Sequence, residues 1–313
     1  MANSIETFPF PFTKDQYEYT NNSSQLNPVR CVEVTGDYNS EIQLKRKLIE
    51  EHPERCYRSF RHSIEGQWEI LKLLFHEIAT YEPDHFTFER RGKEYRFQNL
   101  ILGEEERFID RDLSSIDSEP FDLAGRHVQE DLILMGDREG TLFLDAGQLC
   151  FPSNWSLAFA FGLDFKSIHT PVPRINQTGF IEKVERFIKR IRPGTAWERN
   201  NWSVTITNKL DTPLETYSEW GRSRLKVTEE NVEDLLHLRV EIQRLYRLPL
   251  TNDVLFTIHT YLLSLKDMAT NNEWLTRFFK NVETLTDDIA EYKGISLYKK
   301  PLMNYFEQKV KKD

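Results

Sequence analysis

The sequence contains few cysteines, and none of them lies in a metal or redox motif. Cys31, Cys56 and Cys150 are widely separated, which provides neither a disulfide framework nor the clustered thiols of an iron–sulfur cluster or a structural zinc site. None belongs to a C-x-x-C-H motif, so covalent haem attachment is also excluded.

Nucleotide-binding motifs are absent as well. The chain has no G-x-G-x-x-G sequence and no Walker loop, and therefore lacks a recognisable cradle for a dinucleotide or a nucleotide phosphate. If the protein catalyses redox chemistry, we expect its electrons to come from a partner. The net charge of −9, with acidic and basic residues interspersed, argues against nucleic-acid binding, which normally requires a basic face.

Targeting and membrane segments are not visible either. The opening stretch MANSIETFPFPFTKDQ lacks both the basic start and the uninterrupted apolar run of a signal peptide. No later run is long and apolar enough to span a membrane. We therefore expect a cytoplasmic protein without membrane contact.

What the chain does contain is the composition of a folded protein, with 39% hydrophobic and 12% aromatic residues. A length of 313 residues suffices for two average domains, but we expect one compact unit. Within it we expect an N-terminal arm with supporting helices over residues 1–84, a core over 85–265, and C-terminal helices over 266–313.

Apolar periodicity predicts most of the helices. Residues 8–38 contain prolines and turn formers, and they read as an extended arm packed by its aromatic side chains. Ser40 and Gln43 have the spacing of a capping box at the start of a helix that ends near His52. Three- and four-residue spacing predicts further helices over 64–78, 154–167, 178–191, 274–285 and 302–310.

Strand-like alternation occupies the middle of the chain. HFTFER and EYRFQN alternate around Gly92, which predicts a hairpin, and residues 103–125 then read as an acidic, proline-containing loop. Five further strands are predicted, two within 128–151 and one each over 201–207, 238–245 and 253–261.

The order of these elements is two strands, a helical middle and three strands. It is typical of a PAS-like domain, an antiparallel five-stranded sheet with covering helices. The predicted fold class is therefore α+β, with a PAS-like sheet and helical extensions at both termini. A generic α+β domain with the same element order is the alternative.

His169 is the first candidate for chemistry. The segment IHTPVP at 168–173 places its imidazole where an apolar helix must end, and the prolines make the exit stiff. Iron is bound by a neutral imidazole held at a fixed angle, so His169 is a candidate ligand for an iron cofactor. The alternative is an ordinary helix-terminal histidine that bonds the last carbonyl groups.

Arg239, Glu241 and Gln243 are the second candidate. Strand alternation sends all three side chains to one face of the sheet. Burying three polar groups is costly unless they bond each other or a ligand. They would then form a polarised pocket in which the glutamate accepts from an amine, the arginine stabilises an oxyanion, and the glutamine orients. The alternative is a solvated outer face.

Two further residues accompany these candidates. His259 lies on the next predicted strand and would reach the same pocket if the two strands pair; it is the alternative metal ligand, or else a satisfied core histidine. Trp202 follows Arg199 and Asn201 at a strand start, and its indole N–H needs a partner if it is buried. We interpret this start, and the run at 129–131, as structural.

Several motifs give the chain a resemblance to a known family. QEDLILM, AGQLCFPSNW, IHTPVP, RNNW, and RVEIQRLYRLP followed by VLFTIHTYL occur in this order, with GDY near the N-terminus. Together they resemble the haem-binding α subunit of the haem-dependent oxidative N-demethylases, also called dimethylamine monooxygenases. The resemblance covers most of the chain.

This resemblance implies a non-covalent haem b in a PAS-type fold, where molecular oxygen is activated beside a small secondary amine whose methyl group leaves as formaldehyde. Flavin and iron–sulfur partner subunits would supply electrons from NADPH. His169 would be the axial ligand, and Glu241 would hold the amine. Arg239 would polarise oxygen or pair with a haem propionate, with Gln243 beside it. The remaining cofactor contacts would be Trp155, Phe165, Pro171, Trp202 and His259.

Two departures from the family pattern are visible. The family strand typically reads ERQ where this chain has Glu241-Ile242-Gln243, a change we attribute to packing. The family typically has an arginine where this chain has His259, which is shorter and mostly neutral at pH 7. A haem-based gas sensor, or a family member that has lost haem, are the alternatives to a monooxygenase.

Overall fold

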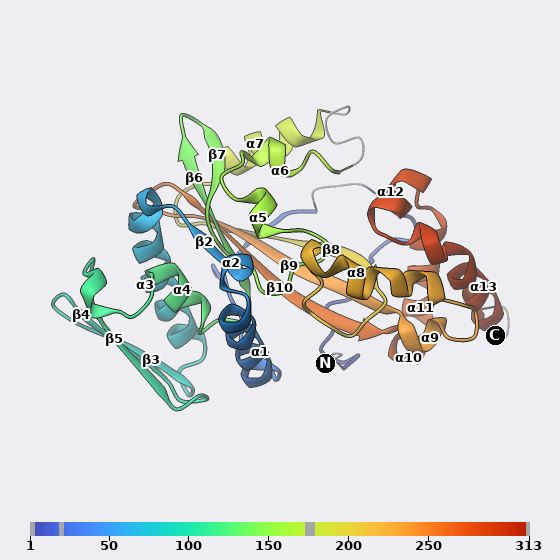
Figure 1. The fold of residues 1–313 in the computed structure, drawn as a ribbon, viewed down its shortest axis with the longest axis horizontal. Helices are drawn as coiled ribbons and strands as arrows, with labels where there is room; N and C mark the ends of the chain where they lie inside the picture. The colour runs from blue at the N-terminus through green and yellow to red at the C-terminus, as the bar shows by residue number, and fades with distance from the viewer. Residues whose placement is uncertain (1–3, 19–21, 173–178, 311–313) are drawn as a thin grey trace.

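The computed structural model describes residues 4–18, 22–172 and 179–310. Its centre is a seven-stranded antiparallel sheet in the order β1-β8-β9-β10-β6-β7-β2 (Figure 1). With thirteen α-helices in the described residues, the protein is α+β, as predicted. The strands are β1 (Ser24–Leu26), β2 (Tyr57–Ser59), β6 (Asp131–Arg138), β7 (Thr141–Gln148), β8 (Ala196–Thr205), β9 (His237–Arg247) and β10 (Val254–Ser264).

The five predicted strands are β6 to β10, and they are adjacent in this sheet. The sheet has seven strands and not the predicted five, because β1 and β2, which were not predicted, lie at its edges. Each of these has three residues, too few for alternation to show.

A second sheet has three antiparallel strands, β3 (Phe86–Arg91), β4 (Glu94–Asn99) and β5 (Glu104–Ile109). The predicted hairpin is β3–β4, turning at Gly92. The prediction of a loop over 103–125 is wrong at both ends, because β5 pairs with β4 and residues 120–125 form a helix, α4 (Pro120–Gly125). Phe108, the buried residue of β5, stacks on its cross-strand partner Tyr95 at 5.2 Å and also lies beside the rings of Trp68, Phe75 and Phe88.

Two long helices support the sheets. In α3 (Ile64–Tyr81) the predicted apolar stripe is buried, and Phe75 stacks at 3.8 Å on Phe97 of the second sheet. The first helix, α1 (Tyr38–Glu51), begins earlier than predicted, after Asp37. The capping box is therefore wrong: the Ser40 hydroxyl donates to the Asp37 carbonyl from inside the first turn.

The predicted helix over 154–167 is divided into two short turns, α5 (Leu157–Ala160) and α6 (Phe165–Ile168). Gly162 lies between them with a φ of +79°, which ends the first turn. Asp164 then caps the second turn by accepting from the Ser167 amide at 3.0 Å. The predicted surface helix after it is α7 (Phe180–Lys189).

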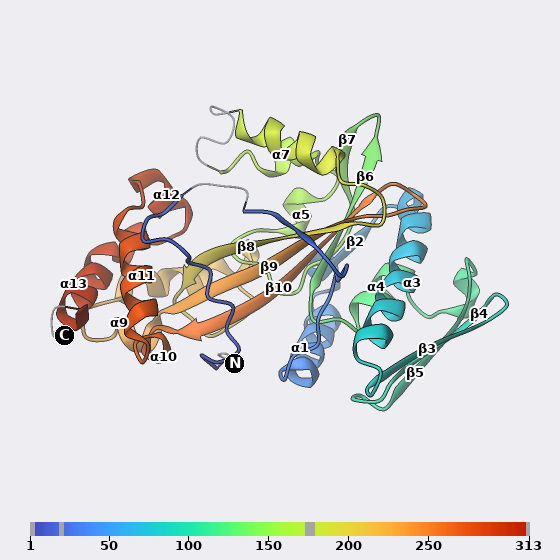
Figure 2. The same ribbon diagram turned by 180° about the vertical axis from the view of Figure 1, so that it is seen from behind.

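The C-terminal helices gather beside the outer edge of β8. Phe10 of the N-terminal arm stacks on Trp274 at 4.3 Å, and Figure 2 shows the arm (blue) crossing these helices before it reaches β8. The arm is therefore packed by its aromatic residues, as predicted. The remaining helices are α2 (Pro53–Cys56), α4 (Pro120–Gly125), α8 (Tyr217–Trp220), α9 (Val232–Leu235), α10 (Leu265–Met268), α11 (Asn272–Glu283), α12 (Asp287–Tyr292) and α13 (Lys299–Val310).

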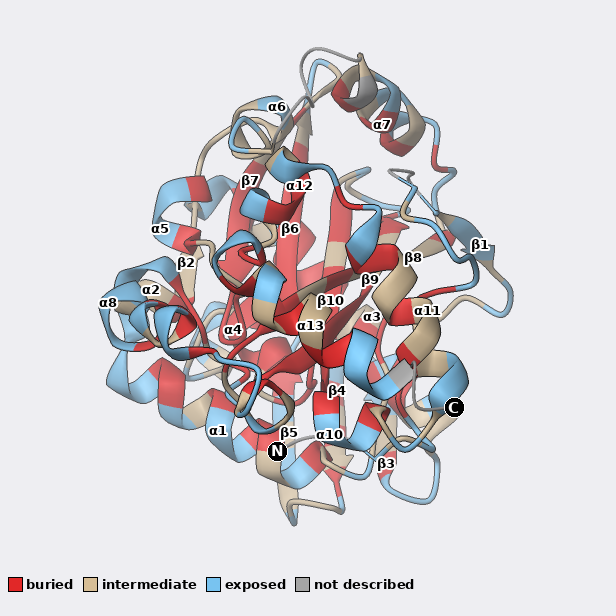
Figure 3. Ribbon diagram, turned by 90° about the vertical axis from the view of Figure 1, so that its right-hand side faces the viewer, coloured by how far each residue is buried: buried red, intermediate tan, exposed pale blue. Residues whose placement is uncertain are grey.

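The central sheet is covered on both faces, and its strands are mostly buried (Figure 3). The face that carries Glu241, called here the Glu241 face, packs against α5, α6 and α7 through residues such as Ile133 and Leu157. The opposite face, called here the His259 face, packs against α1 and α3 and against the C-terminal helices. In the part of the chain that the structure describes, no helix is both long and apolar enough to cross a membrane.

Candidate active site

Glu241 is the centre of a buried polar network on its face of the sheet. Its Oε1 accepts from Nε of Arg239 at 3.2 Å, and its Oε2 accepts from the side-chain amide of Gln243 at 3.0 Å. Asn201 of β8, directly across from Glu241 in the register, donates to Oε2 at 3.3 Å. Three donors therefore hold the carboxylate in one orientation.

Arg239 is anchored by the loops that cover this face. Its guanidinium is fully buried and donates to the Leu210 carbonyl at 2.8 Å, to the Thr260 hydroxyl at 3.1 Å, and to the Phe151 carbonyl. Because Nε donates to Glu241, each of the three guanidinium nitrogens has a protein partner. The arrangement fits a residue that positions Glu241.

Asp131 supports Arg239 indirectly, by holding the backbone at Cys150 and Phe151. Its two carboxylate oxygens accept from the amides of Cys150 and Phe151, at 2.7 and 2.9 Å. Burial raises the pKa of Asp131 to about 6, although Lys45 and these amides oppose the shift. This clamp fixes the Phe151 carbonyl that Arg239 uses, so the structural interpretation of the run at 129–131 holds for Asp131.

His169 is the residue at which α6 ends, and its ring is fixed by a short local hydrogen bond. Nδ1 lies 2.7 Å from the Phe165 carbonyl, and because a carbonyl can only accept, Nδ1 carries the proton. Burial lowers the pKa of His169, and the positive charge of Arg199 lowers it further. The imidazole is therefore neutral near pH 7, with its lone pair on Nε2.

Arg199 lies on the same face of the sheet as the Glu241 network. It lies on β8 directly across from Gln243, and so on the Glu241 face, while its charge acts on His169. The apolar side chains beside this region are half-buried, and they include the predicted contacts Trp155 and Phe165. Pro171 is exposed, and the last proline of the IHTPVP segment lies outside the described residues.

His259 and Trp202 lie on the opposite face. Cross-strand partners in an antiparallel sheet share a face, and His259 is paired with Ile242 while Trp202 is paired with Val240. The expectation that strand pairing brings His259 into the Glu241 pocket is therefore wrong. Trp202 packs edge-on against Phe12 at 4.9 Å, among the C-terminal helices.

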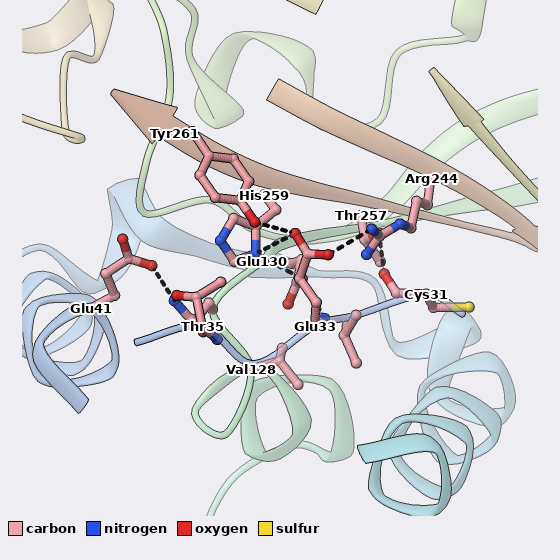
Figure 4. A network of polar contacts seen from close by, with 12 residues as sticks. Cys31, Glu33, Thr35, Glu41, Val128, Glu130, Arg244, Thr257, His259 and Tyr261 are labelled. Carbon is pink, nitrogen blue, oxygen red and sulfur yellow. Dashed lines mark hydrogen bonds and ion pairs between the residues drawn. The ribbon is translucent and has the colours of Figure 1, made fainter. Parts of the chain in front are cut away.

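His259 belongs instead to a separate buried network, drawn in Figure 4. Its Nδ1 lies 2.9 Å from Oε1 of Glu130, and this carboxylate raises the pKa of His259 against the effect of burial. Glu33 of the arm accepts from Tyr261 and from Arg244, the latter at 2.9 Å. Although burial opposes it, the charges of Arg244 and His259 lower the pKa of Glu33 to about 2.

A third group of ionisable side chains lies at the second sheet. Glu104, Glu106 and His127 approach one another closely enough to hold a metal ion. Each has a protein partner, however. Arg46 binds both oxygens of Glu104 at 2.6 and 2.8 Å, and His127 lies 3.1 Å from Glu106. These contacts account for the group without an ion.

Two residues of this region could not be predicted from the sequence, one in the Glu241 network and one at the edge of β8. Asn201 lies in β8, and its sequence context indicates a structural role. Its position opposite Glu241 depends on the register between β8 and β9, which the local sequence pattern does not reveal. Lys293, which follows α12, donates to the Trp202 carbonyl of β8 at 2.6 Å, one residue from Asn201 along the strand. A single lysine after a surface helix gave no signal in the sequence.

Comparison with known families agrees with the motifs. The model of the family described as haem-dependent oxidative N-demethylase, alpha subunit-like, matches residues 22–303. The match includes every strand of the central sheet, as well as His169 and the Glu241 network. The chain therefore belongs to this family of haem-dependent oxidoreductases, the haem-dependent oxidative N-demethylase alpha subunit-like proteins.

Proposed function

We propose that this protein is a haem b-dependent monooxygenase that removes a methyl group, as formaldehyde, from a small amine such as dimethylamine. The observation that carries the proposal is the Glu241 carboxylate, held by three donors on the face whose Arg199 also acts on His169. A carboxylate fixed in this way, on the face of the sheet covered by the segment that carries His169, would provide an amine site on the same side as an iron ligand.

The residues present fit a haem. His169 has Nδ1 bonded to a backbone carbonyl, which sets the tautomer and leaves Nε2 for iron, as is usual for histidine ligands. Trp155 and Phe165 supply an apolar wall, and the three buried cysteines carry no attachment motif, so the haem would be non-covalent. When bound, haem supplies the oxygen activation.

The arrangement of the sheet supports a PAS-type core within the larger fold. Strands β7, β6, β10, β9 and β8 are neighbours in that order, and the segment between β7 and β8 supplies α5, α6 and α7. These helices cover one face only, the Glu241 face. The haem would then lie between that face and the segment that carries His169.

Glu241 would bind the amine through an N–H group. A carboxylate accepts about four hydrogen bonds, and three positions are occupied by Arg239, Gln243 and Asn201. The remaining position is available to a substrate N–H, and the fixed donors mean that little reorganisation is needed when the amine binds. The amine would thereby be oriented with a methyl group toward the haem.

Electrons would come from partner subunits, because the chain has no dinucleotide or flavin motif and its family is described as alpha subunit-like. A flavin and iron–sulfur reductase that uses NADPH fits this requirement.

Glu241→Gln tests the proposal. The variant keeps the size and most hydrogen bonds of the side chain but loses its charge. Haem-loaded wild type should release formaldehyde from dimethylamine when a reductase and NADPH are supplied, and the variant should show the same Soret band with about a hundredfold lower turnover. Full turnover in the variant would remove Glu241 from the mechanism, and absence of a Soret band in haem-reconstituted wild type would end the proposal.

A further inference from the structure

The fold brings together two cysteines that are far apart in the sequence. Cys56 ends α2, Cys150 follows β7, and both are fully buried in one apolar cluster that also contains Phe151. Where β2 pairs with β7, the Cys56 carbonyl accepts from the Leu149 amide at 2.8 Å. Because Cys150 is the next residue after Leu149, the two cysteines are neighbours across this pair of strands.

Their sulfur atoms also contact adjacent points of α1. The Cys56 thiol donates to the Leu48 carbonyl at 3.4 Å, and the Cys150 sulfur lies 3.8 Å from the Lys45 carbonyl oxygen. Carbonyl groups three residues apart lie on the same side of an α-helix, about one turn from each other. The two thiols are hydrogen-bonded to each other as well. They are therefore a buried pair of reduced thiols in direct contact.

The two thiols differ in their surroundings. Nη2 of Arg55 lies 3.8 Å from the Cys56 sulfur. The hydrogen bond from Cys150 lowers the pKa of Cys56, the charge of Arg55 lowers it further, and burial opposes the shift. Burial raises the pKa of Cys150, and its bond with Cys56 raises it further. A thiolate is the reactive form of cysteine, so Cys56 is the nucleophile of the pair.

The backbone at Cys150 is connected to the Glu241 network. The carboxylate of Asp131 accepts from the amides of Cys150 and Phe151, at 2.7 and 2.9 Å. The Phe151 carbonyl accepts from Arg239, whose Nε donates to Glu241. A change in the backbone at Cys150 is thus two hydrogen bonds away from the Glu241 carboxylate.

We propose that Cys56 and Cys150 are a site of reversible oxidation, at which hydrogen peroxide forms a disulfide that disturbs the bond between Arg239 and the Phe151 carbonyl. The disulfide itself goes beyond the proposed function. Its effect on turnover rests on that function, because it takes Glu241 as the amine site. A disulfide requires an S–S separation of about 2.05 Å and a fixed torsion, so its formation draws the Cys150 backbone toward α2.

The reaction has two steps. The Cys56 thiolate attacks one oxygen of hydrogen peroxide, an S–O bond forms, the O–O bond breaks, and hydroxide leaves with the proton that Cys56 has lost, as water. The Cys150 sulfur then attacks the Cys56 sulfur, the S–S bond forms, and the S–O bond breaks with release of a second water. The two sulfurs lose two electrons and the peroxide gains them. Both thiols are buried, so the oxidant enters by local opening, and the reaction should take minutes to hours.

Cys31 provides the matched control. It is the third buried cysteine, but it lies in another apolar cluster, where its amide donates to Glu77 at 2.6 Å. Cys31→Ala removes one buried thiol and leaves the pair intact. Cys56→Ser removes the nucleophile, and its hydroxyl can still donate to the Leu48 carbonyl.

The experiment exposes the haem-loaded full chain to hydrogen peroxide at neutral pH, followed by alkylation of the remaining thiols under denaturing conditions. Mass spectrometry of the digested protein should show peptides joined through Cys56 and Cys150, with Cys31 alkylated. Turnover of dimethylamine should fall about tenfold or more and should return after dithiothreitol, because a small displacement in an active site has large effects on rate. Cys31→Ala should behave as wild type does, and Cys56→Ser should keep its turnover after peroxide.

Each part of the inference can fail separately. Alkylation of all three cysteines after peroxide overturns the disulfide. An equal loss of turnover in wild type and Cys56→Ser, or a disulfide that leaves turnover unchanged, overturns the connection to Glu241. If reduced wild type releases no formaldehyde from dimethylamine, the proposed function fails, whereas the joined peptides still decide whether the disulfide forms.

Discussion

At the scale of single residues, the two histidines singled out in the sequence have different environments. His169 has a lowered pKa and one nitrogen left for a metal, whereas His259 has a raised pKa and is paired with Glu130. Their chemistry differs although both are in contact with aromatic rings, Phe165 for His169 and Tyr261 for His259. The difference follows from the charge of the nearest groups.

His169→Ala should abolish stable haem binding, because no other nitrogen is held in the same position. His259→Gln is the matched control, since Gln can still donate to Glu130 and lies on the other face of the sheet. The absorption spectrum after haem reconstitution and gel filtration measures both. A Soret band retained in His169→Ala and lost in His259→Gln would assign the ligand to His259.

His259 also predicts a pH dependence of stability. Its pKa is raised in the folded protein, so its contribution is complete below the unfolded value of about 6.5 and is lost as pH rises through the folded value. Urea unfolding at about pH 6 and about pH 8.5 should show a larger decrease in wild type than in His259→Gln. An equal decrease in both proteins would contradict the assignment of this proton to His259.

Arg239 should matter more for stability than its partner Gln243. Arg239→Met leaves the Phe151 and Leu210 carbonyls without their donor and Glu241 without its buried counter-charge, with an expected cost of about 3 to 5 kcal/mol. Gln243→Leu removes one hydrogen bond at a half-buried position and should cost about 1 kcal/mol. Urea unfolding gives both values, and similar costs would mean that Arg239 is not the anchor of this face.

At the scale of elements, the long periodic segments were predictable and the short ones were not. Strands β6 to β10 have eight to eleven residues, enough for alternation to appear, and α3 shows its stripe over 18 residues. The division of α5 from α6 was missed because apolar density suggested one helix. The break is made by Gly162 and the cap residue Asp164, whose signals were present in the sequence.

The residues of the candidate site could likewise be predicted only where the pattern lies within one element. That Arg239, Glu241 and Gln243 share a face follows from alternation within one strand, which a sequence displays directly. Which residues of β8 and β10 join them depends on the register between strands that are distant in the chain. A one-residue change of register exchanges the faces, and for this reason His259 was expected beside Glu241 while Asn201 was overlooked.

Gly162 permits a direct test of the break between α5 and α6. Gly162→Ala places a side chain at a φ of +79° and within 3.2 Å of the Phe60 ring, and should cost about 1 to 2 kcal/mol. Gly36→Ala is the control, because its φ is not positive and nothing lies within 4 Å of the added carbon. If both substitutions have the same effect on the melting temperature, the break does not depend on glycine.

At the scale of the whole molecule, the central sheet separates two buried polar networks, one on each of its faces. The Glu241 face carries the proposed amine and haem site beneath α5, α6 and α7. The His259 face carries a buried charged network that joins the arm, α1 and β10 (Figure 4). The second network thus connects the N-terminal arm with the centre of the sheet.

The proposed function predicts that this protein depends on a partner for electrons, because its sequence has no recognisable dinucleotide motif. Purified haem-loaded protein with dimethylamine should not consume NADPH by itself, and addition of a flavin and iron–sulfur reductase should start both NADPH consumption and formaldehyde release. Spectrophotometry of NADPH with a formaldehyde assay measures the two together. NADPH consumption by the chain alone would contradict the need for a partner.

The outer edge of β8 has one more consequence. Among the described residues, β1 pairs with residues 196–198 of this strand, and beyond them the carbonyls of Trp202 and Val204 accept hydrogen bonds from Lys293 and Tyr298. A strand edge with unpaired carbonyls is a template on which another chain can add a strand. Lys293 and Tyr298 bond these carbonyls, so they are not available to a strand of another chain. The contacts that attach the C-terminal helices to β8 should therefore also reduce edge-to-edge aggregation.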